Sequence, residues 1–171
     1  MPVSVEVTPR YVRRARQLAK ERNQSFEEAE AYDNDDDTWG TEPERRNFVG
    51  LMGEFAFAEY ADLKVDTSTR EWSDGGYDFE VVMEGDRRTV DIKTAQKEPS
   101  ALMVKEYAVN ADYYILGHVD EPTVTLYGGA TKETLLNGVR KESRKFDHTN
   151  YTLGVHSLEP LPDPSDIEQI R

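Results

Sequence analysis

The sequence contains no cysteine. Disulfides, thiolate nucleophiles and cysteine-bound zinc are therefore excluded, and any metal must be held by oxygen atoms or by histidine. Histidine is also scarce, because His118, His148 and His156 are the only three, with neither adjacent pairing nor the spacing of ligands on a helix. We expect them to be exposed or hydrogen-bonded, which disfavours a zinc hydrolase or a histidine-based nuclease. A Gly-x-Ser-x-Gly elbow for serine catalysis is absent as well.

Long apolar runs are also missing. The chain has no run of about 18 or more apolar residues. A basic-then-apolar signal at the N-terminus is absent too. We therefore expect a soluble, cytoplasmic protein without membrane contact. Its 171 residues suffice for one domain, and no internal repeat is present. The expected layout is an N-terminal helical extension with an acidic loop (1–40), a core (41–158) and a C-terminal tail (159–171).

Positive charge is in short supply. The chain has 34 acidic and 21 basic residues, a net charge of −13, and only eight of the basic residues are lysine. An acidic, lysine-poor composition favours a salt-loving host, a halophilic archaeon or its virus. The alternative is an acidic protein that mimics nucleic acid or repels it. At 1 M salt the Debye length is about 3 Å, so net acidity does not exclude a DNA substrate.

Basic residues gather in two places. Thr8-Pro9 is a typical helix start, and the helix that follows has one apolar face. The opposite face carries Arg10, Arg13, Arg14, Arg16, Lys20 and Arg22. The second cluster comprises Arg140, Lys141, Arg144 and Lys145. The helix face is either a solvated surface or a phosphate-contacting one, and on the functional interpretation Arg13, Arg14, Arg16, Arg140, Lys141 and Arg144 bind nucleic acid.

A second helix is predicted from Thr41 to about Tyr60. A capping box with a proline in the first turn opens it, and the residues that follow are apolar almost all round. Such a helix is buried, and Gly50 and Gly53 would let another element approach closely. Glu54 then lies in a largely apolar setting. An ionised carboxylate there must be protonated, paired or bound to a metal.

The most specific pattern is a strand that carries Asp91 and Lys93. Alternation places both side chains on one face, with Val90 and Ile92 on the other. The spacing alone is weak, because Asp62-Leu63-Lys64 repeats it at the expected end of the second helix. The neighbouring strand decides between the two matches.

That neighbouring strand runs to Met83 and is followed by the turn Glu84-Gly85-Asp86. With a two-residue loop Glu84-Gly85, Asp78 falls opposite Asp91. One step further along, Asp78 faces Lys93 instead. Both registers gather the three polar groups on one face, whereas the intermediate register does so only with a bulge.

Further elements are expected after the hairpin. We predict strands at 102–104, 111–119 and 123–127. A short helix over 131–136 follows Gly128-Gly129. The tail over 160–164 is expected to cross the surface.

Taken in order, these motifs resemble a known family. Gly50-Leu51-Met52-Gly53-Glu54 on a helix, then Gly76-Tyr77-Asp78, then Asp91-Ile92-Lys93-Thr94 in a hairpin resemble the PD-(D/E)XK nuclease superfamily. The likeness is greatest to small phage and prokaryotic members, and the motif order covers residues 42–96. A weaker likeness continues over 111–136. No proline precedes Asp78, where the family's name would place one, although many members lack it.

The resemblance implies an α/β protein with a restriction-endonuclease-like core, a central mixed β-sheet flanked by helices. It also implies that Asp78 and Asp91 bind Mg²⁺ or Mn²⁺ and that Glu54 completes or orients the site. Lys93 would position the attacking water or help to deprotonate it. Gln96 is similar to an additional glutamine of some exonuclease-type members.

The expected function is metal-dependent hydrolysis of DNA phosphodiester bonds, with RNA not excluded as a substrate and a homodimer possible. Hard oxygen ligands suit Mg²⁺, which keeps several waters and accepts a phosphate oxygen. Two alternatives stay open. One is an inactive nucleic-acid-binding or assembly protein with the same fold, and the other is an acidic DNA mimic.

Overall fold

The chain forms a mixed α/β fold in the computed structural model, which describes residues 2–29, 43–65, 78–142 and 149–170. The helices are α1 (Pro9–Ala29), α2 (Pro43–Ala61) and α3 (Lys132–Leu136), with short 3-10 turns at η2 (Glu106–Ala108), η3 (Val155–Ser157) and η4 (Pro164–Asp166). The strands are β1 (Val3–Glu6), β2 (Phe79–Met83), β3 (Asp86–Ala95), β4 (Ala101–Lys105), β5 (Tyr113–Asp120), β6 (Thr123–Thr131), β7 (Val139–Glu142), β8 (Thr149–Gly154) and β9 (Ile167–Gln169).

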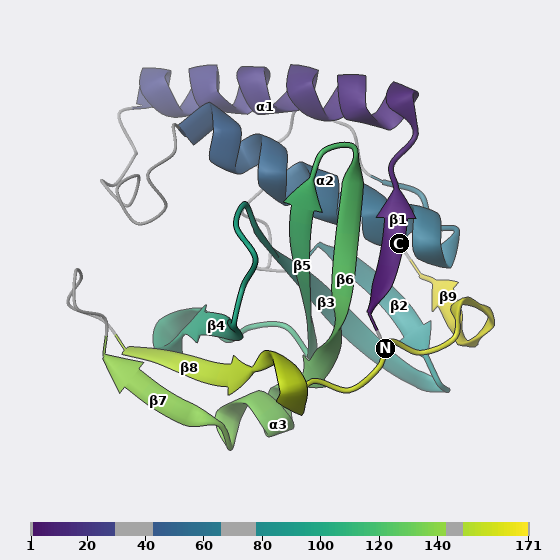
Figure 1. The fold of residues 1–171 in the computed structure, drawn as a ribbon, viewed down its shortest axis with the longest axis vertical. Coiled ribbons are helices and arrows are strands. Elements are labelled where there is room, and N and C mark those ends of the chain that lie inside the picture. The colour runs from purple at the N-terminus through teal and green to yellow at the C-terminus, as the bar shows by residue number, and fades with distance from the viewer. Residues whose placement is uncertain (1, 30–42, 66–77, 143–148, 171) are drawn as a thin grey trace.

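The strands form two sheets. The main sheet has the order β1-β6-β5-β3-β2-β9, with β3 and β5 parallel and the other neighbours antiparallel. The smaller sheet has the order β4-β8-β7. In Figure 1, α1 and α2 lie on one side of the main sheet, and the smaller sheet and α3 lie on the other. The expected central mixed sheet flanked by helices is therefore present.

Each side of the main sheet has its own core. Ile115 of β5 is buried with α2 in the larger cluster, whereas its neighbours Tyr114 and Leu116 are buried with Leu102 of β4 and Leu135 of α3. Side chains on a strand alternate between faces, so β5 contributes to both cores. A strand buried on both faces reads as one continuous apolar run, as 113–116 does.

The two long helices match the sequence prediction. α1 begins at Pro9 and α2 runs from Pro43 to Ala61. α2 is buried along most of its length and packs between α1 and the sheet. A Cβ atom at Gly53 would lie 1.9 Å from the Thr94 hydroxyl, so the close approach predicted there is confirmed. The same prediction is wrong for Gly50, where a Cβ would meet no atom within 4 Å.

The β2–β3 hairpin has the predicted two-residue loop. Glu84 (φ 51°) and Gly85 (φ 87°) are both left-handed, as a type I′ turn requires. Met83 pairs with Asp86, and Phe79 pairs with Val90. The Asp78 amide extends this pairing by donating to the Val90 carbonyl over 2.8 Å. Asp78 therefore falls opposite Asp91, in the first of the two registers considered.

Other elements differ from the prediction in extent. β6 continues through Gly128-Gly129 to Thr131, beyond the predicted end at 127. Glycine is required at Gly129, because a Cβ there would lie 2.5 Å from the Tyr113 ring. Residues 1–40 and 159–171, expected outside the core, each add an edge strand to the main sheet. β1 pairs with β6, and β9 pairs with β2.

No helix within the described ranges is both long and apolar enough to span a bilayer.

Candidate active site

The hairpin brings two carboxylates to the same part of β3. Asp78 directs its side chain at the neighbouring backbone, where Oδ2 accepts a hydrogen bond of 2.8 Å from the Ile92 amide. The residue as a whole is exposed, but this hydrogen bond holds its carboxylate against β3. Asp91 lies opposite it in the ladder. The structure therefore brings together the two aspartates that the sequence singled out.

Lys93 is held beside Asp91. Its Nζ atom lies 2.9 Å from Asp91 Oδ2, and the two side chains are 40% and 14% exposed. β5 is the neighbouring strand in the sheet, and in it Tyr114 pairs with Asp91 and Leu116 with Lys93. Tyr114 is fully buried, and its hydroxyl accepts a hydrogen bond of 3.0 Å from the Ala111 amide. The ion pair therefore lies beside buried residues of β5.

Burial and like charges act together on Asp78. The pKa of its carboxyl is raised well above the ordinary value by burial, then by the negative charges of Glu54 and Asp91, although the bond from Ile92 opposes the shift. Glu54 on α2 is partly buried and close enough to contribute this charge. A group that resists ionisation among other carboxylates is typical of a functional site.

The pKa of Lys93 shifts in the direction that keeps it charged. Burial alone would lower this pKa, but the charge and hydrogen bond of Asp91, with the charge of Asp78, outweigh burial and raise it. The ammonium is therefore protonated at neutral pH. It can neutralise an anion better than it can accept a proton.

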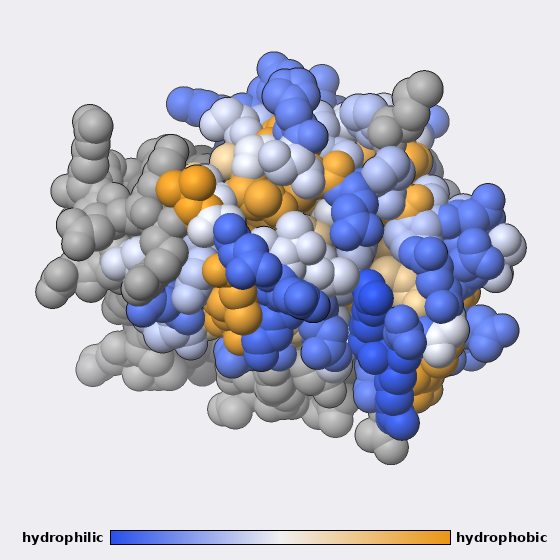
Figure 2. Space-filling view, turned by 90° about the horizontal axis from the view of Figure 1, so that it is seen from below, coloured by the Kyte–Doolittle hydropathy of each residue, from blue (hydrophilic) through white to orange (hydrophobic). Residues whose placement is uncertain are grey.

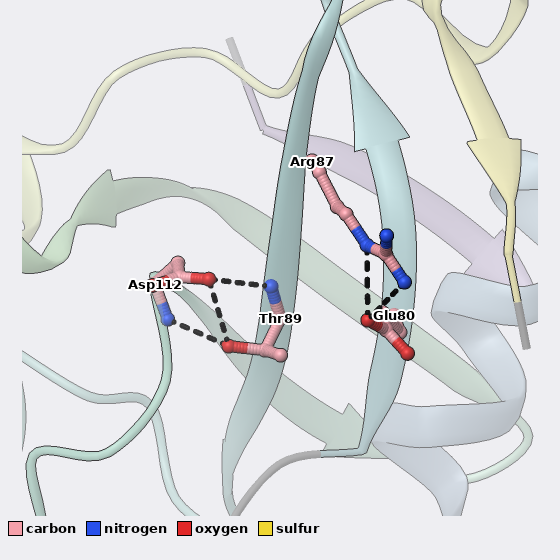
Figure 3. Close-up of polar contacts among 4 residues, drawn as sticks. All are labelled: Glu80, Arg87, Thr89 and Asp112. Atoms are coloured by element: carbon pink, nitrogen blue, oxygen red, sulfur yellow. Dashed lines mark hydrogen bonds and ion pairs between the residues drawn. The ribbon is translucent and has the colours of Figure 1, made fainter.

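Two polar contacts fix the hairpin around the site (Figure 3). Thr89 donates from its amide (2.9 Å) and its hydroxyl (3.1 Å) to Asp112 Oδ2, and the Asp112 amide donates back to the Thr89 hydroxyl over 3.0 Å. This clasp ties β3 to the start of β5. Across the hairpin, an Arg87 Nη atom lies 3.1 Å from a Glu80 carboxylate oxygen. This clasp supports the β3–β5 register, in which Asp91 pairs with Tyr114.

A cavity of about 460 Å³ opens next to Lys93. Its walls come from α2, the end of β3, the β3–β4 connection and β4. Charged residues of the lining are Arg46, Lys93 and Lys97 against Glu98 alone. Lys93 is paired with Asp91, so Arg46 and Lys97 against Glu98 leave the lining with a small excess of positive charge in a chain of net charge −13.

The predicted site residues are distributed as follows. Lys93 and Gln96 line the cavity, whereas Asp78, Asp91 and Glu54 do not. Asp91 forms the ion pair with Lys93, and the charges of Asp91 and Glu54 act on Asp78. Gln96 Oε1 is buried without a hydrogen-bond partner. Among the residues that the structure describes, no group of three or more His, Asp or Glu side chains is placed to hold a metal ion. Metal binding by Asp78, Asp91 and Glu54 therefore stays a prediction.

The alternative match at Asp62-Leu63-Lys64 lies elsewhere. Asp62 directly follows α2 and has a left-handed backbone (φ 56°), and the Lys64 backbone is hydrogen-bonded to the Gln169 side chain. Neither residue lines the cavity. The same spacing that creates a charged face on β3 creates none at a helix end.

Of the α1 arginines predicted to bind nucleic acid, Arg16 makes contacts within the protein, and the prediction stays untested for all three. Arg16 forms an ion pair with Glu121, and its guanidinium lies 4.8 Å from the Phe48 ring centroid. These contacts tie α1 to α2 and to the β5–β6 turn, so Arg16 has a structural role. Arg13 is exposed and Arg14 is half-buried. Neither of them lines the cavity beside Lys93.

The second basic cluster is described only in part. Arg140 and Lys141 belong to β7, where they pair with Tyr151 and Asn150. Arg144 lies outside the described residues. The predicted nucleic-acid contacts of these residues stay predictions.

Sequence reasoning missed Arg46 and Lys97. Arg46, Gly50 and Glu54 recur at intervals of four on α2, and such residues share one face of a helix. This spacing could have identified Arg46. Lys97 carries no comparable signal, because it lies in an irregular connection whose path depends on the packing of β4.

Comparison with known proteins adds no assignment. No protein-family model matches the chain, and no curated protein or solved structure is significantly similar to it. Function must therefore be inferred from the chemistry of the site.

Proposed function

We propose that the protein is a metal-dependent nuclease that hydrolyses DNA phosphodiester bonds on a restriction-endonuclease-like core. The observation that carries this proposal is the set of Asp78, Asp91 and Lys93 on one hairpin, beside a positively charged cavity. Carboxylates suit a hard divalent cation, and the cavity suits an anionic substrate. Glu54 adds a third negative charge from α2.

The donor set fits Mg²⁺ or Mn²⁺. The carboxyl of Asp78 is hard to ionise because of burial and of Glu54 and Asp91, and a bound cation would offset that repulsion. Two carboxylates are sufficient, since Mg²⁺ keeps several waters and shares its remaining positions with a phosphate. Asp78 and Asp91 would hold the ion, with Glu54 beside them. When bound, the ion lowers the pKa of water and polarises the phosphoryl oxygen.

Lys93 acts on the phosphate through its charge. Its raised pKa keeps the ammonium protonated, so it donates hydrogen bonds and neutralises the charge that develops on the phosphoryl oxygens. The 2.9 Å contact with Asp91 fixes the ammonium beforehand, and this placement costs no reorganisation during the reaction. Lys93 thereby orients the phosphate and the attacking water rather than serving as the base.

The alternative is an inactive nucleic-acid-binding or assembly protein with the same fold. One observation favours it: the described part of the chain contains no group of three or more acidic or histidine side chains placed to bind a metal ion. Such a protein would keep the charged cavity and would bind nucleic acid without cutting it.

The deciding experiment incubates the protein with linear, circular and branched DNA, with and without Mg²⁺ or Mn²⁺, in molar KCl. The nuclease proposal predicts cleavage that EDTA abolishes. Tight binding without cleavage of DNA or RNA under any of these conditions would establish the alternative.

A further inference from the structure

We infer that the cavity beside Lys93 receives an unpaired nucleotide, and that a single strand leaving it crosses the outer face of β4 to Tyr107. The substrate is then single-stranded DNA, or the single-stranded part of a branched or frayed molecule. This inference rests on the proposed function and specifies its substrate.

The cavity has the size and lining for a base. A volume of about 460 Å³ is within the usual range for small-ligand pockets and holds one nucleoside, not a segment of duplex. Val49, Leu116 and Met103 supply apolar surface for a base, whereas Arg46 and Lys97 supply charge for its phosphates. Bases extruded from a duplex are bound in this way, by apolar contact with the ring and polar contact with its edge.

Two side-chain oxygen atoms of the lining residues lack hydrogen bonds. Thr94 Oγ1 and Gln96 Oε1 are buried, and neither has a partner in the structure. Buried polar atoms are nearly always satisfied, so each unsatisfied one calls for a missing partner. An amino or imino group on the edge of a base can supply such a donor to the Gln96 side chain, whereas Thr94 Oγ1 packs against Gly53 of α2.

An exposed surface continues from the cavity along β4. Met103, 48% exposed, lines the cavity, and Lys105 follows it on the same face of the strand. The Lys105 ammonium lies 5.8 Å from the ring centroid of Tyr107, which is 70% exposed. Met103 and Tyr107 are about 10 Å apart along the chain, at the rise of a strand and then a 3-10 turn. Exposed aromatic rings beside cations are typical platforms for stacked bases in single-strand binding.

The exposed large hydrophobic side chains of the described residues all lie at this end of the molecule. They are Met103, Tyr107, Leu136 and Val139, on β4, η2, α3 and β7. Figure 2 shows this end from below, where hydrophobic patches interrupt a mainly hydrophilic surface. Met103 and Val139 both pair with Thr152 of β8, so they form one row across the small sheet. The combination of this apolar row and the cations beside it suits bases joined by phosphates.

Gly50 offers a direct test, because a side chain there would enter the cavity. Its Cβ position meets no atom within 4 Å, so substitution introduces no clash. Affinity is measured without divalent metal by fluorescence anisotropy, using oligothymidylate and a blunt duplex at several KCl concentrations. We expect wild type to prefer the single strand. Gly50→Phe should weaken that binding about tenfold or more, whereas Gly50→Ala should retain it.

Tyr107 and Lys97 supply two further variants. Tyr107→Ala should weaken binding of an oligothymidylate of about 12 nucleotides but not of one of about four, and Tyr107→Phe should behave as wild type. Lys97→Glu reverses a charge at an exposed position and should lower single-strand affinity. It therefore tests the pocket independently of whether Gly50→Phe folds.

Equal affinity of wild type for both probes would overturn the inference. So would unchanged single-strand binding by a folded Gly50→Phe or by Lys97→Glu. These failures differ from failure of the proposed function. If the protein cleaves DNA with Mg²⁺ but Gly50→Phe does not change its single-strand affinity, it is a nuclease without this pocket. If Gly50→Phe and Lys97→Glu weaken single-strand binding but the protein never cleaves, it has the pocket and is not a nuclease.

Discussion

Replacing Asp78 with asparagine should stabilise the protein at neutral pH. The substitution removes a charge that Glu54 and Asp91 oppose, and the amide oxygen can still accept the hydrogen bond from Ile92. Burial also disfavours the Asp78 charge, but the residue as a whole is exposed, so the two like-charge contacts, each screened by solvent to about 0.5 kcal/mol, set a lower bound on the gain. Two such contacts amount to about 1 kcal/mol, which raises the melting temperature of a domain of 171 residues by about 2–4 °C.

This gain should depend on pH in a defined direction. The pKa of Asp78 is raised in the folded protein, so its protonation favours folding. That stabilisation is complete below the ordinary carboxyl pKa of about 4 and is lost as the pH rises through the raised value. Asp78→Asn should therefore melt above wild type at pH 8 and approach it near pH 4, as calorimetry can measure.

Asp86 on the same hairpin provides the matched control. Its side chain is 74% exposed and pairs with Arg88 at 3.6 Å, so Asp86→Asn removes an attractive contact and should give no gain. A melting temperature of Asp78→Asn at or below that of wild type at pH 8 would show that the charges of Glu54 and Asp91 do not destabilise the folded protein through Asp78. A gain that is the same at pH 4 and pH 8 would lead to the same conclusion.

Three further predictions follow from the same geometry. Mg²⁺ or Mn²⁺ should raise the melting temperature of wild type, because a ligand that binds only the folded state stabilises it, and an equal shift in Asp91→Ala would contradict a site there. Gly53→Ala should lower the free energy of unfolding, measured with urea, by about 2 kcal/mol or more, because its Cβ would overlap a side chain of β3. Gly50→Ala should raise the free energy of unfolding by about 0.5–1 kcal/mol. Similar values for the two variants would show that the contact between α2 and β3 is misplaced. Arg16→Ala should lower the melting temperature and leave DNA affinity unchanged, because Arg16 is paired within the protein. Arg13→Ala, at an exposed position, should leave the melting temperature unchanged. A loss of DNA affinity in Arg16→Ala would show that Arg16 binds phosphate.

Elements with strong local signals were predictable from sequence. Thr8-Pro9 and the capping box mark the starts of α1 and α2. Glu84-Gly85 predicts the hairpin loop, and the observed register is one of the two that the sequence left open. The burial of an all-apolar helix predicted a close neighbour correctly at Gly53 and wrongly at Gly50, because burial does not say which turn of the helix another element approaches.

Features that depend on tertiary packing were not predictable in this way. The strands β1 and β9, of four and three residues, owe their existence to the sheet edges they pair with. The ion pair of Arg16 with Glu121 joins residues more than a hundred positions apart, so a basic helix face in sequence could not be told from a structural one. The cavity beside Lys93 likewise depends on how β4 packs, which no local pattern encodes.

In the proposed nuclease, Asp91 and Lys93 carry out phosphodiester hydrolysis, and Asp62 and Lys64 provide a control with the same spacing in the same chain. The most direct measurement is the single-turnover rate of DNA cleavage with Mg²⁺ for alanine variants at these four positions, with DNA binding measured in parallel. Asp91→Ala and Lys93→Ala should each lower the rate about 100-fold or more while binding largely survives, and Asp62→Ala and Lys64→Ala should cleave as wild type does. Cleavage that survives in Asp91→Ala and Lys93→Ala, or that falls equally in all four variants, would contradict the assignment of this site.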